Sequence, residues 1–408
     1  MGEYSALIKL LVVFVIIIGN MLILHKPMWI GGIAAAVATI LLYRLDGATI
    51  LNCLKSGIFG WTTIQMLLVF YFITFVQRML EKRRCLVQAQ QDLSALYNNR
   101  RINASVAPSI IGLLPAAGAV LMCGDIVREA TDGYLSKEEQ CFVTSFFRHV
   151  PEAFMPTYTS TLIAISMTEG RVKTGTFVLA MLPMVLMLYV LGNAFYLRKV
   201  PKDAGAKREK SVSYYYKDLL KNLWVLIFVI VLVLAFNIPV YWATLAGLIA
   251  FIFIGRFKWE ELKPMIVSAF ETKMMGTTVV IMVFKETLTA SGVIGMLPDY
   301  FAKLPIPTYL VFALIFFFGT MVAGTQAIIV LCMPMAMATV TGSALPLFIL
   351  CMTMTYVVMQ LSPTHICLEI CADDYGLSMG DYLKKAFPVI ISFVPIVLAY
   401  YWVLDLIV

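Results

Sequence analysis

The chain has 408 residues, of which 61% are hydrophobic and 13% are charged, and its formal net charge is +7. A soluble protein carries about 25% charged residues, so this composition excludes an ordinary soluble domain and indicates a polytopic, all-α membrane protein. The basic residues gather between apolar runs, so no nucleic-acid partner is expected. The eight cysteines form no CxxC pair and there are only three histidines, so neither a metal site nor another cofactor is expected.

Apolar runs predict the elements of the first half in chain order: spans at 6–24, 28–43 and 58–80, a basic amphipathic segment at 81–101, a re-entrant hairpin at 103–131, a broken helix at 139–168 and a span at 174–197. The hairpin is expected because the apolar run 103–131 is interrupted by Pro-Ala-Ala-Gly. Its predicted tip consists of Pro115, Ala116, Ala117 and Gly118.

A basic linker at 198–221 leads to the second half, which is predicted to contain spans at 222–237, 240–255 and 266–290, an amphipathic piece at 294–304, a hairpin at 307–340, a broken helix at 344–371 and a last span at 383–404. The element order repeats that of the first half. Each half then crosses the bilayer five times, and an odd number of crossings inverts the second half relative to the first.

The distribution of Lys and Arg predicts the orientation of the chain. Segments 81–101 and 198–221 are the richest in basic residues and fall on the same side under this count, so the positive-inside rule makes both cytoplasmic. Both termini are then expected outside the cytoplasm, in a multi-pass protein of the plasma (inner) membrane.

The first broken helix carries ionisable and hydroxyl groups at membrane depth. Arg148, His149 and Glu152 lie near its middle, and ionisable groups there are expensive in hydrocarbon and by default mark a functional path. Pro151 and Pro156 break the helix. The residues around this break that we expect to bind substrate are Pro156, Thr157, Tyr158 and Thr159.

The second broken helix and the second hairpin tip have the same character. We expect the two breaks to face each other across one site, because a shared polar cavity can satisfy the backbone groups that both breaks release. The residues predicted here are Gly324, Thr325, Gln326, Ser362, Pro363, Thr364 and His365. The alternative is that the hydroxyls only repair backbone hydrogen bonds at a kink.

Several charged side chains are candidates for ion coupling. Arg148 and Glu152 are spaced to pair on one helix face, either as a neutral structural pair or as an anion ligand and a proton carrier. His365 and Glu369 pose the same choice, with His365 either titrating or capping a helix. Asp125 fits a solvated or capping role better than a proton site.

The pattern resembles the ion-transporter superfamily, which includes divalent anion:sodium symporters and the large membrane subunits of TRAP transporters, and most closely an uncharacterised bacterial branch. The resemblance rests on Arg148-His149, on Leu361-Ser-Pro-Thr-His-Ile-Cys-Leu368 and on Gly324-Thr-Gln-Ala-Ile328. It implies an elevator mechanism and a homodimer. It also implies the following division: scaffold 1–101 and 222–304, transport domain 102–197 and 305–408, and cytoplasmic linker 198–221.

The sequence therefore predicts a secondary active transporter of a small organic anion, coupled to Na⁺ or H⁺. Helix N-termini at the breaks attract anions, and released carbonyls can coordinate a cation. The alternatives are a membrane subunit of a TRAP-like system, an ion channel or an intramembrane enzyme. The sequence contains no HExxH, GxSxG or P-loop motif, so no enzyme is expected.

Overall fold

The computed structural model describes residues 5–22, 24, 28–113, 119–203, 210–303, 305–362 and 365–408. These residues form helices and no β-strand. The helices of the first half are α1 Ser5–Leu22, α2 Met28–Tyr43, α3 Gly47–Phe59, α4 Trp61–Lys82, α5 Cys85–Tyr97, α6 Arg100–Ile111, α7 Ala119–Thr131, α8 Lys137–His149, the 3₁₀ helix η1 Val150–Ala153, α9 Thr159–Ser166, α10 Thr174–Phe195 and the 3₁₀ helix η2 Leu197–Lys199.

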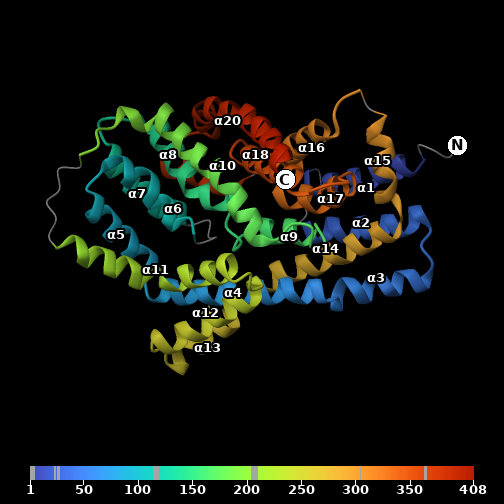
Figure 1. Ribbon diagram of the computed structural model, residues 1–408, viewed down its shortest axis with the longest axis horizontal. Helices are drawn as coiled ribbons and strands as arrows, with labels where there is room; N and C mark the ends of the chain where they lie inside the picture. The colour runs from blue at the N-terminus through green and yellow to red at the C-terminus, as the bar shows by residue number, and fades with distance from the viewer. Residues whose placement is uncertain are drawn as a thin grey trace.

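The helices of the second half are α11 Val212–Ala235, α12 Val240–Ile254, α13 Trp259–Ser268, α14 Thr272–Ala290, α15 Val293–Ala302, α16 Thr308–Ala323, α17 Thr325–Ala338, α18 Leu345–Met359, α19 Ile366–Asp374 and α20 Met379–Ile407. Along one side of the molecule α3 and α4 run end to end, with α14 packed on α3 and α12 on α4 (Figure 1).

The core is built around α18, in which every residue from Leu345 to Met359 is buried. Its sequence is apolar on all sides, as expected for a helix enclosed by protein or lipid. The middle of α17 and nearly all of α8 are buried as well, including the polar side chains of Thr144, Ser145 and Arg148. The helices that precede the two predicted breaks, α8 and α18, therefore lie inside the protein.

Several helices in the described part of the chain have the length and apolar composition to cross a membrane. Four meet both criteria, and a fifth does so if α13 and α14, which meet at a bend of 41°, form one span. Large apolar side chains such as Leu41, Phe59 and Phe253 remain exposed, at 70%, 73% and 76% of their surface. Such side chains suit a lipid environment.

The interruptions predicted at Pro151–Pro156 and at Gly324 correspond to breaks between α-helices. In the first predicted hairpin the arms are α6 and α7, which pack together, while Pro115–Gly118 lies outside the described residues. The second hairpin is α16 and α17, separated only by Gly324, whose φ of +79° favours glycine. The broken helices are α8, η1 and α9 in one half, and α18 and α19 in the other.

Three connections that the sequence analysis left between spans are helical. Residues 44–55 contain most of α3, which begins where the Asp46 carboxylate accepts hydrogen bonds from the N–H groups of Ala48 and Thr49. The basic segment 256–263 contains the start of α13, and the linker 198–221 contains the first turns of α11. Hydropathy alone missed these helices, because capping signals and not apolar length define their starts.

Candidate functional site

The two helix breaks touch through a pair of histidines. His149 is the last residue of α8, and His365 directly precedes α19. Their Nε2 atoms lie 3.1 Å apart although the residues are 216 positions apart in sequence. His149 is fully buried. The expectation that the breaks face each other is thus met in the geometry of these two side chains.

The His149 ring is held by its own helix. Its Nδ1 lies 2.6 Å from the carbonyl oxygen of Ser145, one turn earlier in α8. Because a carbonyl oxygen only accepts, Nδ1 carries the proton, and Nε2 presents its lone pair to His365. His365 Nε2–H is then the donor of the 3.1 Å contact.

Arg148 and Glu152 form a close ion pair next to the histidines. Arg148 Nη1 lies 2.6 Å from Glu152 Oε1, and the two side chains are 1% and 13% exposed. The helix ends at His149, and η1 brings Glu152 back under Arg148. The pair is therefore present as a structural feature, and both side chains line a cavity.

A cavity of about 400 Å³ collects the predicted polar groups. This volume suits a small-molecule ligand. Its lining residues are Arg148, Glu152, Tyr158, Thr159, Ser160, Thr325, Gln326, Met359, His365 and Cys367. They come from both breaks and from the second hairpin tip, so segments from the two halves of the chain meet at one place.

Three helices begin beside this cavity: α9 after Tyr158, α17 after Gly324 and α19 after His365. Among the described residues, no side chain caps any of these N-termini by a hydrogen bond. Free backbone N–H groups and the helix dipole make each N-terminus attractive to an anion. The guanidinium of Arg148 lies alongside, paired with the Glu152 carboxylate on the same cavity wall.

Other contacts fix the surrounding elements. The hydroxyls of Tyr158 and Ser109 donate to the carbonyl oxygens of Gly112 and Phe147, which ties α6 to the first break. Arg171, in the turn after α9, donates hydrogen bonds to the carbonyl oxygens of Met337, Val340 and Gly342 at the far end of α17. These bonds join α9 and α17 at the ends opposite the cavity.

Not every predicted residue lies at the cavity. Pro156 and Thr157 line a separate, mostly apolar cavity between the first break, α4 and α11, and Ser362 is buried beside the second break. Asp125 pairs with Arg128 at 2.8 Å and its side chain is 83% exposed, as suits a solvated group. Glu369 is exposed on α19. Pro115, Ala116, Ala117, Gly118, Pro363 and Thr364 lie outside the described residues.

The sequence analysis missed Cys367, Ser160 and Met359, which also line the cavity. Cys367 follows His365 by two residues, which places both side chains at the second break. A signal was therefore present in the His-Ile-Cys sequence. Ser160 could have been included by continuing the hydroxyl run that begins at Thr157.

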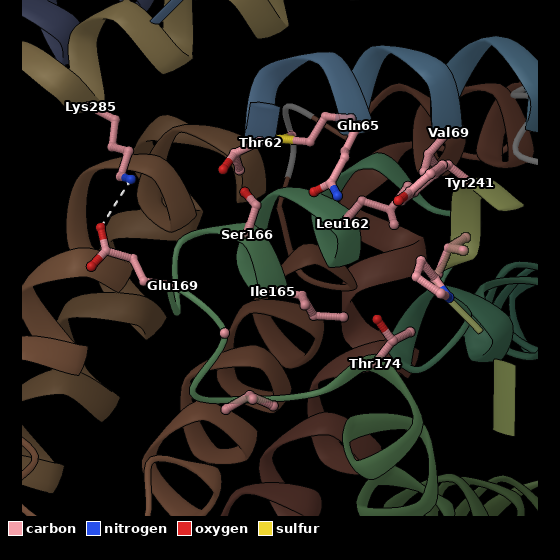
Figure 2. Close-up of a pocket in the computed structure, with 15 residues that line it drawn as sticks. Thr62, Gln65, Val69, Leu162, Ile165, Ser166, Glu169, Thr174, Tyr241 and Lys285 are labelled. Atoms are coloured by element: carbon pink, nitrogen blue, oxygen red, sulfur yellow. Dashed lines mark ion pairs between the residues drawn. The ribbon is translucent and has the colours of Figure 1, made fainter. Parts of the chain in front are cut away.

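A second cavity, of about 530 Å³, lies where α9 meets α4 and α14. Figure 2 shows Thr62, Gln65 and Ser166 on its wall and the ion pair between Lys285 and Glu169 at its edge. Lys285 Nζ lies 3.0 Å from Glu169 and 3.6 Å from Glu286. The contact between Lys285 and Glu169 was not predicted from the sequence.

The apolar helices indicate a membrane protein that is helical across the described residues, with a polar, partly charged cavity where two helix breaks meet. The chain belongs to the family described as protein of unknown function (DUF401), whose sequence profile matches residues 5–407. No curated protein matches the chain in sequence.

Proposed function

We propose that this chain is a secondary active transporter of a small organic anion of the carboxylate type, coupled to H⁺ or Na⁺. The observation that supports this most is the convergence of three uncapped helix N-termini and the buried Arg148 on one cavity. Each N-terminus acts as roughly half a positive charge. An anion of a few heavy atoms would gain several N–H hydrogen bonds there and is the ligand that this electrostatic environment favours.

The Arg148–Glu152 pair suggests how a proton would couple to the anion. In the structure, Glu152 neutralises Arg148 at 2.6 Å. A bound carboxylate would take over that role, and the Glu152 carboxylate would then be an excess negative charge in a buried site unless it takes up a proton. Anion and proton would thus bind together. In a sodium-coupled mechanism, the free carbonyls of the breaks would hold the cation.

Alternating access would follow from the repeated element order. In this proposal, residues 102–197 and 305–408 slide as a transport domain against a scaffold of 1–101 and 222–304, within a homodimer in the inner membrane and with both termini outside. The repeat in element order that the sequence predicts, and the resemblance to the ion-transporter superfamily, support this mechanism. The second cavity lies on the proposed boundary, because α9 belongs to one part and α4 and α14 to the other.

Flux into liposomes tests the proposal. The purified full-length chain would be reconstituted alone and supplied with a panel of radiolabelled small carboxylates under a pH or Na⁺ gradient. We expect gradient-driven accumulation that saturates with substrate. Linear flux that is never concentrative would indicate a channel. Accumulation only after a periplasmic binding protein is added would support the TRAP-like alternative.

Two cavity variants locate the site. Thr325→Val removes a hydroxyl while keeping the shape, and Gln326→Leu removes an amide, so each should weaken anion binding by about 1 kcal/mol, or roughly fivefold. Thr157→Val is the matched control, because Thr157 lines the other cavity. Equal effects of Thr325→Val and Thr157→Val on affinity would place the binding site elsewhere.

A further inference from the structure

The cavity holds a second chemical feature that anion transport does not require. His149, His365 and Cys367 each offer one ligand atom, and these atoms lie within 4.8 Å of one another. Two imidazoles and one thiol form a donor set typical of zinc. The sequence analysis expected no metal site because only three histidines are present, but two of these three lie together here.

The distances fit a tetrahedral ion. Two nitrogens bound at about 2.0–2.1 Å in a tetrahedron lie roughly 3.3 Å from each other, and a sulfur at about 2.3 Å lies roughly 3.6 Å from each nitrogen. The His149 and His365 Nε2 atoms already lie 3.1 Å apart. A small side-chain adjustment would bring the Cys367 sulfur from within 4.8 Å to bonding position.

The surroundings of His149 prepare it as a ligand. Its Nδ1–H donates to the Ser145 carbonyl at 2.6 Å, which fixes the ring and leaves the Nε2 lone pair free to point at the ion. Metal-binding histidines usually donate their other N–H in this way. His149 is fully buried, whereas His365 and Cys367 line the cavity. An ion would therefore arrive from the cavity side.

We propose that His149 Nε2, an imidazole nitrogen of His365 and the Cys367 thiolate bind one Zn²⁺ ion, with the fourth coordination position open to the cavity. On binding, the proton on His365 Nε2 moves to Nδ1, and the thiol releases its proton to solvent, so one proton leaves per ion bound. This inference does not depend on the transport proposal, because it concerns ion binding alone.

The charges determine what the fourth position accepts. Zn²⁺ and Arg148 contribute three positive charges, and the Cys367 thiolate and the Glu152 carboxylate contribute two negative charges. The remaining positive charge favours a hydroxide or a small carboxylate as the fourth ligand. Three protein ligands with one open position is the arrangement of zinc sites that bind an exchangeable ligand, in contrast to closed structural sites.

Metal titration of the full-length protein tests the site. After removal of bound metals, we expect isothermal titration to show one Zn²⁺ per chain. Co²⁺ should produce tetrahedral visible bands and a thiolate-to-cobalt charge-transfer band, both of which disappear when Zn²⁺ is added. Cys367→Ser should abolish the charge-transfer band, and His365→Gln should weaken Zn²⁺ binding at least about tenfold.

Matched controls separate the site from adventitious binding. Cys371→Ser, on the same helix, and His25→Gln, which changes the third histidine, should leave Zn²⁺ affinity and the cobalt spectrum unchanged. Zinc X-ray absorption of the unmodified protein, which needs no variant, should show one sulfur and two nitrogen ligands. No binding, or a zinc shell without sulfur, would overturn the proposal and leave the two histidines as a structural hydrogen bond.

Discussion

Lys285 Nζ lies 3.0 Å from Glu169 Oε1, and this ion pair joins α14 to the turn after α9. In the proposed mechanism α14 belongs to the scaffold and Glu169 to the transport domain. The Lys285 side chain is 11% exposed and that of Glu169 is 67% exposed. Partly exposed ion pairs contribute about 0–1 kcal/mol, so this one is weak enough to break and re-form during a transport cycle.

We therefore predict that fixing this contact stops transport. A short bifunctional thiol reagent should join the double variant Lys285→Cys and Glu169→Cys and abolish flux in liposomes. A cleavable reagent should restore flux on reduction. Glu169→Cys alone, treated identically, is the control, and the eight native cysteines are all buried. Undiminished flux through the cross-linked protein would contradict a sliding movement at this boundary.

The second prediction concerns the buried ion pair. Glu152→Gln removes the charge that lies 2.6 Å from Arg148, whose side chain is 1% exposed. Because a buried charge is left undercompensated, we expect the free energy of unfolding to fall by about 3 kcal/mol. Chemical unfolding in detergent measures this change, with Glu129→Gln at an exposed position as the control. The double variant Arg148→Met and Glu152→Leu should lose less stability than the sum of the single changes.

For Thr157 we predict a substitution that raises the free energy of unfolding. Its hydroxyl is buried and has no hydrogen-bond partner among the described residues. Replacing it by an isosteric methyl in Thr157→Val removes the cost of a buried, unsatisfied group, so the protein should become about 1 kcal/mol more stable. Thermal unfolding checks this, with Thr161→Val as a second test of the same kind. Loss of stability would show that the Thr157 hydroxyl is hydrogen-bonded.

We predict that the stability of the protein depends on pH through Asp92 on α5, which lies outside the membrane-spanning helices. Burial, together with the neighbouring Asp218 carboxyl on α11, raises the pKa of Asp92 to about 6. The unfolded value is about 3.9, so the folded state binds the extra proton. The stability that the protonated form contributes is fully present below about pH 4, and it is lost as the pH rises through about 6.

Asp92→Asn should therefore be more stable than the unmodified protein at pH 7.5, and the difference should disappear near pH 4. Unfolding temperatures of the two proteins between pH 4 and 8 measure this. Asp132→Asn, at an exposed position, should not change the pH profile. A constant offset between Asp92→Asn and the unmodified protein at every pH would rule out Asp92 as the titrating group.

The last prediction concerns orientation. A cysteine at position 205 in the basic linker should be protected from an impermeant maleimide in intact cells and should react after permeabilisation. A cysteine at position 47, which is exposed at the start of α3, should react in intact cells. Both results follow from the positive-inside rule applied to the linker. The reverse pattern would invert the predicted topology.

The sequence predicted the helix interruptions well because their causes are local. Pro151 and Pro156 lie between α8 and α9, and Gly324 has a positive φ between α16 and α17, so these two breaks could be located without the tertiary fold. Proline alone is not sufficient, because Pro108, Pro183 and Pro334 lie inside helices. The helices α3, α13 and the start of α11 were missed because the analysis followed apolar length. Their starts are marked by capping residues such as Asp46 and Ser211.

The sequence could predict that the two helix breaks meet at the candidate site. It could not predict which way each side chain points. Thr157 and Thr159 are neighbours in one hydroxyl run, yet they line different cavities. Their directions depend on the turn between η1 and α9, which the sequence does not specify. The 3.1 Å contact between His149 and His365 likewise depends on how two distant helices pack.

Arg171 affects the geometry of the cavity although it does not line it. It clasps the carbonyl end of α17 from the turn after α9, while the opposite ends of both helices open on the cavity through Thr325 and Thr159. The spacing of the two helices at Arg171 therefore also constrains the distance between their ends at the cavity. We therefore expect a substitution at Arg171 to change the size of ligand that the cavity accepts. No ligand in the cavity would contact that side chain.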